Sequence, residues 1–259
     1  TVSQLSKNRL ELFRKKRLTE ISKRKGRAVK PSTVNRDVSN LRAMLNKAVE
    51  HAKIEVNPIG RIKLLEENNV RERVLSQDEF ESLHLHCPPS LKGIVLIGFY
   101  LPMRQAEILN LTWKEIDLKM GFIRLGGERT KNKIGRNIPL HPRIIEFLRA
   151  CPRPIDGGYV FGNSRRFNRK AYNKAVESAG IADFNFHDLR HCAINNMRLA
   201  GNDHFVIKQA SGAKTDSAFQ RYNLVTEQEM KSIKWLDEKS VKSGTMDTYM
   251  DTSTKTKIV

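Results

Sequence analysis

Apolar residues near the N-terminus recur at the spacing of an amphipathic helix. In the stretch STVNRDVSNLRAMLNKAVEHA, residues 32–52, they fall at steps of three and four: Val34, Val38, Leu41, Leu45 and Ala48. This period places them on one face of a helix. An earlier helix is predicted over residues 4–21. Together the two predict a small helical module, because a disordered tail would carry no apolar stripe.

A break in the periodicity separates this module from the rest of the chain. Asn57-Pro58 and Gly60 interrupt the helical pattern, and the aperiodic stretch EENNVRERVLS follows. We therefore expect a helical domain over residues 1–65, a linker over 66–75 and a second domain over 76–239. Ser76-x-x-Glu79 has the spacing of a capping box and predicts a new helix there. Residues 240–259 are polar and aperiodic and predict a flexible tail.

The sequence pattern of the second domain predicts mainly helices and a small β-sheet. Strand-like alternation marks GFIRL, residues 121–125, and RNIPL, residues 136–140, with the polar turn GGERTKNKIG between them. Helical patterns cover residues 91–100, 104–111, 142–150, 168–179, 188–200, 203–210, 215–223 and 227–236. The predicted fold class is thus mainly α with a small sheet in the second of two domains.

The charge balance indicates a polyanionic partner. The 259 residues carry 47 Lys and Arg against 28 Asp and Glu, a net charge of +19, and the stretch through Arg73 alone carries 19 against 8. Lys and Arg that displace counterions from DNA or RNA gain affinity without reading sequence. A basic membrane-surface protein is the competing interpretation. The candidate DNA-binding residues lie off the apolar stripe of the second helix: Arg36, Arg42 and Lys47.

Several other classes of protein are disfavoured by composition. No stretch resembles a signal peptide or approaches the roughly 20 apolar residues of a membrane helix, so we expect a soluble, cytoplasmic protein. Cys87, Cys151 and Cys192 are widely spaced and form no CxxC pair, which indicates reduced thiols rather than disulfides or a zinc site. Because the chain opens on Thr1 without methionine, we expect a fragment or a processed form.

Four short stretches carry polar residues that packing explains poorly. They are MRQAEILNLTW with Arg104, RTKNKIGRNIPL with Lys131, FHDLRH with His187 and Arg190, and FQRYNL with Tyr222. Taken singly, each has an ordinary explanation: an arginine paired with Glu107 at i+3, a solvated lysine, a chance His-x-x-Arg, a half-buried tyrosine.

Taken together, the same residues form a set for phosphodiester chemistry. Two arginines can clamp the oxygens of one phosphate and stabilise a pentacovalent transition state. A histidine can move a proton near neutral pH, and a lysine can protonate a departing alkoxide. A tyrosine hydroxyl can attack phosphorus to give a covalent ester. Such a set could break a DNA strand without a metal ion.

The motifs that carry these residues resemble those of the tyrosine recombinases, or phage-type integrases. The first family motif, roughly T-G-x-R-x-x-E-(I/L)-x-x-L-x-W, is matched by LPMRQAEILNLTW at Arg104, Glu107, Ile108, Leu111 and Trp113. The hairpin lysine maps to Lys131, ahead of Pro139 and Leu140. The H-x-L-R-H motif is present as HDLRH, with His187, Arg190 and His191. The closing motif maps to Gly212 and Tyr222, and residues 32–58 resemble the core-binding domain of the family.

The resemblance implies a two-domain clamp in which a core-binding helical domain and a catalytic domain grip duplex DNA. It implies that Tyr222 forms a 3′-phosphotyrosine, that Arg104 and Arg190 bind the phosphate, that Lys131 protonates the leaving oxygen and that His187 assists. Glu107 and His191 would support this machinery. No cofactor, metal or ATP is expected. The implied partners are double-stranded DNA with paired recombination core sites and other protomers in a synaptic tetramer.

The segment after Tyr222 is a candidate contact between protomers. Met230, Ile233 and Leu236 give it an apolar stripe, which could dock on a neighbouring copy or pack on its own domain.

Two positions depart from the family pattern. Leu101-Pro102 replace Thr-Gly, and Pro102 could begin a helix. Ala213 stands where the family usually has histidine, sometimes tryptophan. Because alanine has no side-chain donor, and removing a transition-state donor typically costs about 10²–10³ in rate, we expect impaired cleavage with DNA binding largely intact. Natural variation, an engineered substitution and a misplaced alignment all remain open as explanations.

Rival functions share part of this pattern. A type IB topoisomerase would use similar chemistry without paired sites, and a recombinase-derived protein that only binds DNA would account for Ala213. A metal-dependent nuclease or transposase is disfavoured, because no acidic triad or zinc spacing stands out.

Overall fold

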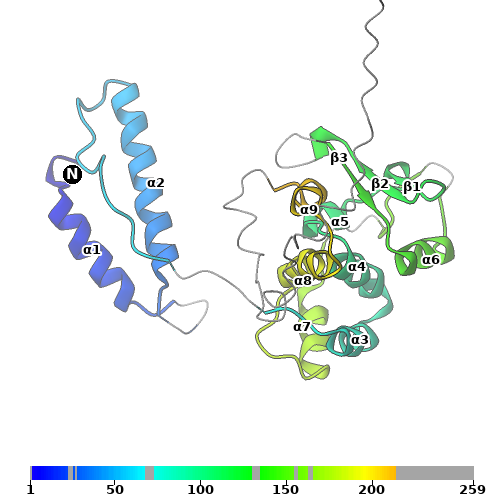
Figure 1. Cartoon of the computed structure of the whole chain (residues 1–259). Helices are drawn as coiled ribbons and strands as arrows, with labels where there is room; N and C mark the ends of the chain where they lie inside the picture. Colours follow the sequence, from blue (N-terminus) through cyan, green and yellow to red (C-terminus); the bar gives the residue numbers. More distant parts are fainter. Residues whose placement is uncertain are drawn as a thin grey trace, which may run out of the picture. The chain divides into compact units, whose positions relative to one another are not determined.

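The chain divides into two compact units, Thr1–Arg71 and Glu72–Val259 (Figure 1). The computed structural model describes residues 2–22, 26, 28–67, 73–129, 135–154, 157–162 and 166–213. The predicted helices over 215–223 and 227–236 and the predicted tail over 240–259 lie outside the described residues.

The first unit is built on two helices, α1 (Lys7–Thr19) and α2 (Pro31–Glu50), after a 3₁₀ turn at Val2–Gln4. Its core comprises Leu10, Val29, Val34, Val38, Leu45 and Ile59. The predicted first helix, 4–21, is too long: the Ser6 side chain accepts from the Arg9 amide and caps the start of α1, and Glu20 takes an extended conformation at its end. Arg17 pairs with Asp37 at 3.1 Å, which ties α1 to α2.

The second unit is mainly helical, as predicted. Its helices are α3 (Gln77–His86), α4 (Pro89–Tyr100), α5 (Gln105–Leu109), α6 (Pro142–Ala150), α7 (Arg169–Ser178), α8 (Phe186–Leu199) and α9 (His204–Ser211). The predicted capping box at Ser76 is confirmed, since its hydroxyl accepts from the Glu79 amide at 3.1 Å and the Glu79 carboxylate accepts from the Ser76 amide at 2.9 Å.

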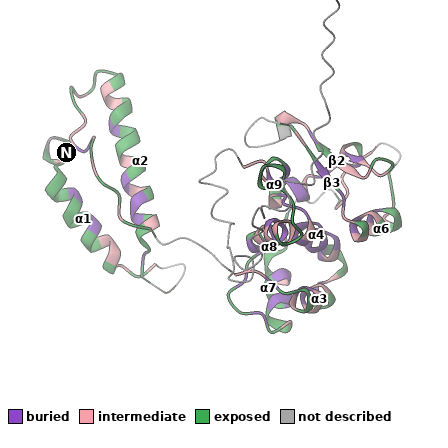
Figure 2. Ribbon diagram, in the orientation of Figure 1, coloured by how far each residue is buried: buried purple, intermediate pink, exposed green. Residues whose placement is uncertain are grey.

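Helix α4 runs through the middle of the core. Its buried residues include Leu91, Ile94, Val95, Leu96, Ile97 and Phe99, so it is apolar nearly all round, as a central helix must be (Figure 2). It packs most extensively on α8, where a Cβ on Gly98 would lie 3.2 Å from Leu189 Cδ1. This close contact fixes α8 against α4.

A three-stranded antiparallel sheet, in the order β1 (Ile116–Asp117), β2 (Phe122–Leu125), β3 (Arg136–Pro139), lies beside these helices. The two predicted strands are confirmed, and Ile123 pairs with Ile138 on the buried face. Strand β1 was not predicted, because two residues give no readable alternation. Gly127–Arg129, within the predicted polar turn, form a 3₁₀ helix (η3).

The cysteines form no disulfide, and burial raises the pKa of Cys87 to about 11 and of Cys192 to about 12. Among the described helices, none is long and apolar enough to cross a membrane.

Candidate active site

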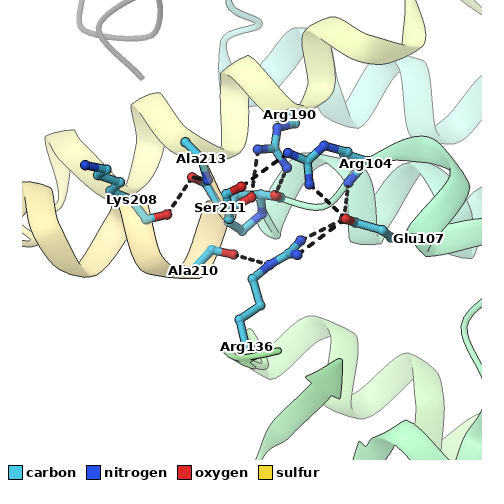
Figure 3. Close-up of polar contacts among 10 residues, drawn as sticks. Arg104, Glu107, Arg136, Arg190, Lys208, Ala210, Ser211 and Ala213 are labelled. Atoms are coloured by element: carbon cyan, nitrogen blue, oxygen red, sulfur yellow. Dashed lines mark hydrogen bonds and ion pairs between the residues drawn. The ribbon is translucent and has the colours of Figure 1, made fainter. Parts of the chain in front are cut away.

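Three arginines from three different elements meet at the C-terminus of α9 (Figure 3). They donate to three successive main-chain carbonyls: Arg136 Nε to Ala210 O at 2.9 Å, Arg190 Nη2 to Ser211 O at 2.8 Å, and Arg104 Nη2 to Gly212 O at 3.2 Å. The last carbonyls of a helix have no partner within the helix and carry partial negative charge. The helix end therefore organises a cluster of positive charge.

Arg104 is held by the start of α5. It occupies the position before the first helical residue, in an extended conformation, and its own amide donates to Glu107 Oε2 at 2.7 Å. Its Nη1 donates to Glu107 Oε1 at 3.0 Å, so the predicted pair with Glu107 is present. The Arg104 side chain is 28 % exposed, which leaves it accessible to a ligand.

Glu107 is a buried carboxylate between two guanidinium groups. Its side chain is 6 % exposed, and besides Arg104 it accepts from Arg136 Nη2 at 2.7 Å and Nη1 at 3.3 Å. Burial alone raises the pKa of Glu107, but the hydrogen bonds and charge of Arg136 and the bonds from Arg104 outweigh it and lower the pKa. The carboxylate is therefore ionised at neutral pH.

Arg190 is buried on α8 and joins the segment after α4 to the end of α9. Besides Ser211 O, its guanidinium donates through Nη1 to the carbonyl of Pro102. The expectation that Pro102 could begin a helix is wrong: Leu101 caps the end of α4, and α5 begins only at Gln105. The Pro102 carbonyl instead helps to fix Arg190.

His187 lies one turn before Arg190 on α8, so the predicted shared helical face is confirmed. Part of its ring reaches solvent, yet neighbouring atoms displace enough water to lower the pKa of His187, and the charges of Arg190 and Arg104 lower it further. The imidazole is therefore mostly neutral near pH 7 and can accept a proton. The ring of His191 meets it edge-on, with centroids 5.6 Å apart.

The turn after α9 brings Ala213 to the same place. Gly212 has a φ of +65°, and a Cβ there would lie 2.9 Å from Arg136 Nη1, so both conformation and space require glycine. The Ala213 amide donates to Ser211 Oγ at 3.2 Å, and its methyl group packs against the cluster of Ile194 and Ile207. Its side chain offers this site no hydrogen-bond donor.

Not every predicted residue can be placed. Lys131 and Tyr222 lie outside the described residues. Arg36, Arg42 and Lys47 are exposed on α2, in the other unit. Arg36 and Lys47, three turns apart, share a face of α2, and Arg42 lies off that face.

Arg136 is not among the site residues predicted from the sequence. Its signal was present: Arg136 is two residues before Ile138 and therefore on the buried side of strand β3, where a charged residue needs a partner. In the described part of the chain, no group of three or more His, Cys, Asp or Glu residues could hold a metal ion.

The sequence pattern of the phage integrase family matches residues 73–229, more than half of the chain. The chain belongs to this family. Among curated relatives, a shufflon-specific DNA recombinase of Escherichia coli is 31% identical over 215 residues, covering 81% of this chain and 55% of the relative. The integrase of Salmonella phage P22 is 27% identical over 203 residues, covering 71% and 52%. The chain thus spans about half the length of these relatives.

Solved structures share the fold of this family member. An integrase of transposon Tn1549, in complex with a circular intermediate DNA, matches with a TM-score of 0.68 at 16% identity, covering 89% of this chain and 85% of that one. A lambda integrase dimer bound to a COC′ core site matches with a TM-score of 0.66 at 17% identity, covering 85% and 80%.

Proposed function

We propose that the chain cleaves and rejoins DNA strands as a site-specific recombinase or integrase, for integration or excision of a mobile element. The observation that carries this proposal is the convergence of Arg104 and Arg190 at the end of α9, with His187 one turn before Arg190 and the buried carboxylate of Glu107 bound to Arg104. Membership of the phage integrase family supports the same activity.

In the proposed reaction, Tyr222 attacks the scissile phosphorus. The bond from phosphorus to the 5′ oxygen breaks, a 3′-phosphotyrosine forms, and Lys131 gives a proton to the leaving 5′ oxygen. Neutral His187 takes the proton that the Tyr222 hydroxyl loses and returns it in the reverse step, in keeping with its lowered pKa. Attack by another strand's 5′ hydroxyl reverses these steps and regenerates Tyr222 without ATP.

The two arginines would act differently on the phosphate. The contacts of Arg104 to Glu107 and Gly212 use one donor each on Nη1 and Nη2, and a guanidinium carries about five N–H donors. With its partly exposed side chain, Arg104 can therefore also bind a phosphate oxygen directly. Arg190, 4 % exposed, adds fixed positive charge where negative charge develops.

The first unit supplies the proposed DNA-binding surface. The stretch through Arg73 carries 19 Lys and Arg against 8 Asp and Glu, and Arg36 and Lys47 are exposed on one face of α2. Arg42 extends the basic surface of this helix. Such residues displace counterions from the DNA backbone. The proposed partner is double-stranded DNA with paired core sites, and the proposed place of action is on that DNA.

Other protomers are the second proposed partner, in a synaptic tetramer. A largely apolar cavity of about 860 Å³ in the second unit is lined by residues of α8, α9 and the sheet, among them Phe122, Leu140, Met197, Phe205 and Val206. Phe205 and Val206 are 64 % and 57 % exposed. We assign this cavity to the segment 227–236 of a neighbouring copy, because that segment carries an apolar stripe and the lining of the cavity is largely apolar.

The absence of a donor at Ala213 favours a second candidate function. A recombinase-derived protein that binds core sites but cleaves slowly would have this site, with its arginines intact and the usual histidine replaced.

Plasmid assays separate these functions. A substrate with two core sites should be recombined, and a supercoiled plasmid without such sites should not be relaxed. Relaxation without recombination would instead establish a type IB topoisomerase activity, and binding without either product would favour the DNA-binding candidate.

A further inference from the structure

Arg136 is one of the three arginines that bind main-chain carbonyls at the end of α9. Its side chain is 5 % exposed, and it reaches from strand β3 to two other elements. Two of its nitrogens bind the Glu107 carboxylate, and the third binds the carbonyl of Ala210 (Figure 3). We propose that Arg136 is a positioning residue for strand cleavage; this inference rests on the proposed function.

The first part of this role is electrostatic. Glu107 alone would neutralise Arg104 as a close ion pair, and the two together would present little charge to a phosphate. Arg136 supplies a second guanidinium to the same carboxylate, so the group of three keeps one net positive charge. Because Arg104 is the more exposed of the two arginines, that charge is available to an anion on its side.

The second part is geometric. Arg136 and Arg104 bind the same carboxylate, so fixing Glu107 from β3 also fixes Arg104. Arg136 also holds Ala210, the first of the three carbonyls at the end of α9, while Arg190 and Arg104 hold the next two. The turn at Gly212, from which the chain continues towards Tyr222, is thus set by the arginine cluster itself.

The requirement for glycine at residue 212 follows from the same contact. A Cβ there would lie 2.9 to 3.2 Å from three atoms of the Arg136 guanidinium group. The turn therefore packs directly on Arg136, and loss of the guanidinium would leave a space behind the turn and leave Arg104 as the only one of the two arginines bound to Glu107.

The test is single-turnover cleavage of a nicked suicide DNA substrate, with DNA affinity measured in parallel. Arg136→Ala should slow cleavage by about 10²-fold at saturating DNA, as misplacement of a catalytic group by about 1 Å does, with little change in the DNA dissociation constant. Added guanidinium ion, at millimolar concentration, should restore part of the rate by filling the vacated site.

Arg124→Ala is the matched control, because Arg124 lies on the neighbouring strand β2 in an exposed pair with Asp117. This variant should cleave at the unsubstituted rate.

Arg136→Lys guards against a folding defect. Lysine keeps the charge but cannot bridge both Glu107 oxygens and the Ala210 carbonyl, so this variant should fold and still cleave at least 10-fold more slowly. An unsubstituted rate in a folded Arg136→Ala or Arg136→Lys variant would overturn the positioning role alone. A lack of adduct with the unsubstituted chain would refute the proposed function and, with it, this inference.

Discussion

Replacing Glu107 by glutamine should remove a large part of the stability of the second unit. The carboxylate, 6 % exposed, accepts four hydrogen bonds, two each from Arg104 and Arg136. Glutamine keeps one acceptor oxygen, but its amide nitrogen would face donors, so about half of these contacts are lost. The buried Arg136 and the partly exposed Arg104 also lose their counter-charge. Hydrogen bonds to charged groups contribute about 1.5–3 kcal/mol each, and breaking a buried ion pair costs about 3–5 kcal/mol.

We therefore expect Glu107→Gln to lower the free energy of unfolding by about 3–5 kcal/mol at pH 7. Urea unfolding followed by far-ultraviolet circular dichroism measures this change. The control is Glu81→Gln, because Glu81 makes an equally bidentate pair with Arg143 in which the side chains are 44 % and 39 % exposed, and solvent-exposed pairs contribute at most about 1 kcal/mol. An equal loss of unfolding free energy in Glu107→Gln and Glu81→Gln would show that burial does not make the Glu107 contacts stronger.

The stability difference between the unsubstituted chain and Glu107→Gln should depend on pH. The pKa of Glu107 is lowered in the folded chain, so its contribution is complete above the ordinary carboxyl pKa of about 4.3 and is lost as the pH falls towards the folded value. The unfolding free energies of the unsubstituted chain and Glu107→Gln should thus begin to converge below about pH 4.3. A constant difference down to pH 3 would contradict this assignment of the charge.

Three further substitutions test the site and the DNA-binding surface. Ala213→His should raise the single-turnover cleavage rate, by up to about 10²–10³-fold, with little change in DNA affinity, and an unchanged rate would count against the mapping of Ala213. Arg36→Ala and Lys47→Ala should each weaken DNA binding and reduce the slope of log affinity against log salt by about 1, measured by fluorescence anisotropy. Met44→Ala, on the same helix at a residue 69 % exposed, is the control, and equal slopes in all variants would exclude this face of α2 as a phosphate contact.

Local sequence patterns predicted the helices well, because the spacing of apolar residues and the capping residues each depend on only a few neighbouring positions. The apolar stripe of α2 places Val34, Val38 and Leu45 in the core, as its spacing requires. The Ser76–Glu79 capping box marks the start of α3 to the residue. The predicted first helix, residues 4–21, is longer than α1. These residues are largely polar and contain no strong helix breaker, so only the hydrogen bond of Ser6 decides where α1 begins.

The arginine cluster could be predicted only in part. Arg104 and Glu107 are three residues apart, and their pair follows from helical geometry. Arg136 reaches Glu107 across 29 residues and Ala210 across 74, and no local pattern encodes such contacts. The motif glycine at residue 212 was recognised by resemblance, whereas its physical reason, close approach to the Arg136 guanidinium, depends on the packing of β3 against α9.

We propose that Tyr222 carries out strand cleavage within the site built by Arg104 and Arg190. Trapping on a nicked suicide substrate with a labelled 3′ side tests it most directly: the unsubstituted chain should become covalently linked to the label, peptide mapping should place the link on Tyr222, and Tyr222→Phe should bind the same DNA without forming the adduct. An adduct that persists in Tyr222→Phe, or cleavage that leaves a free 3′ hydroxyl, would contradict the account.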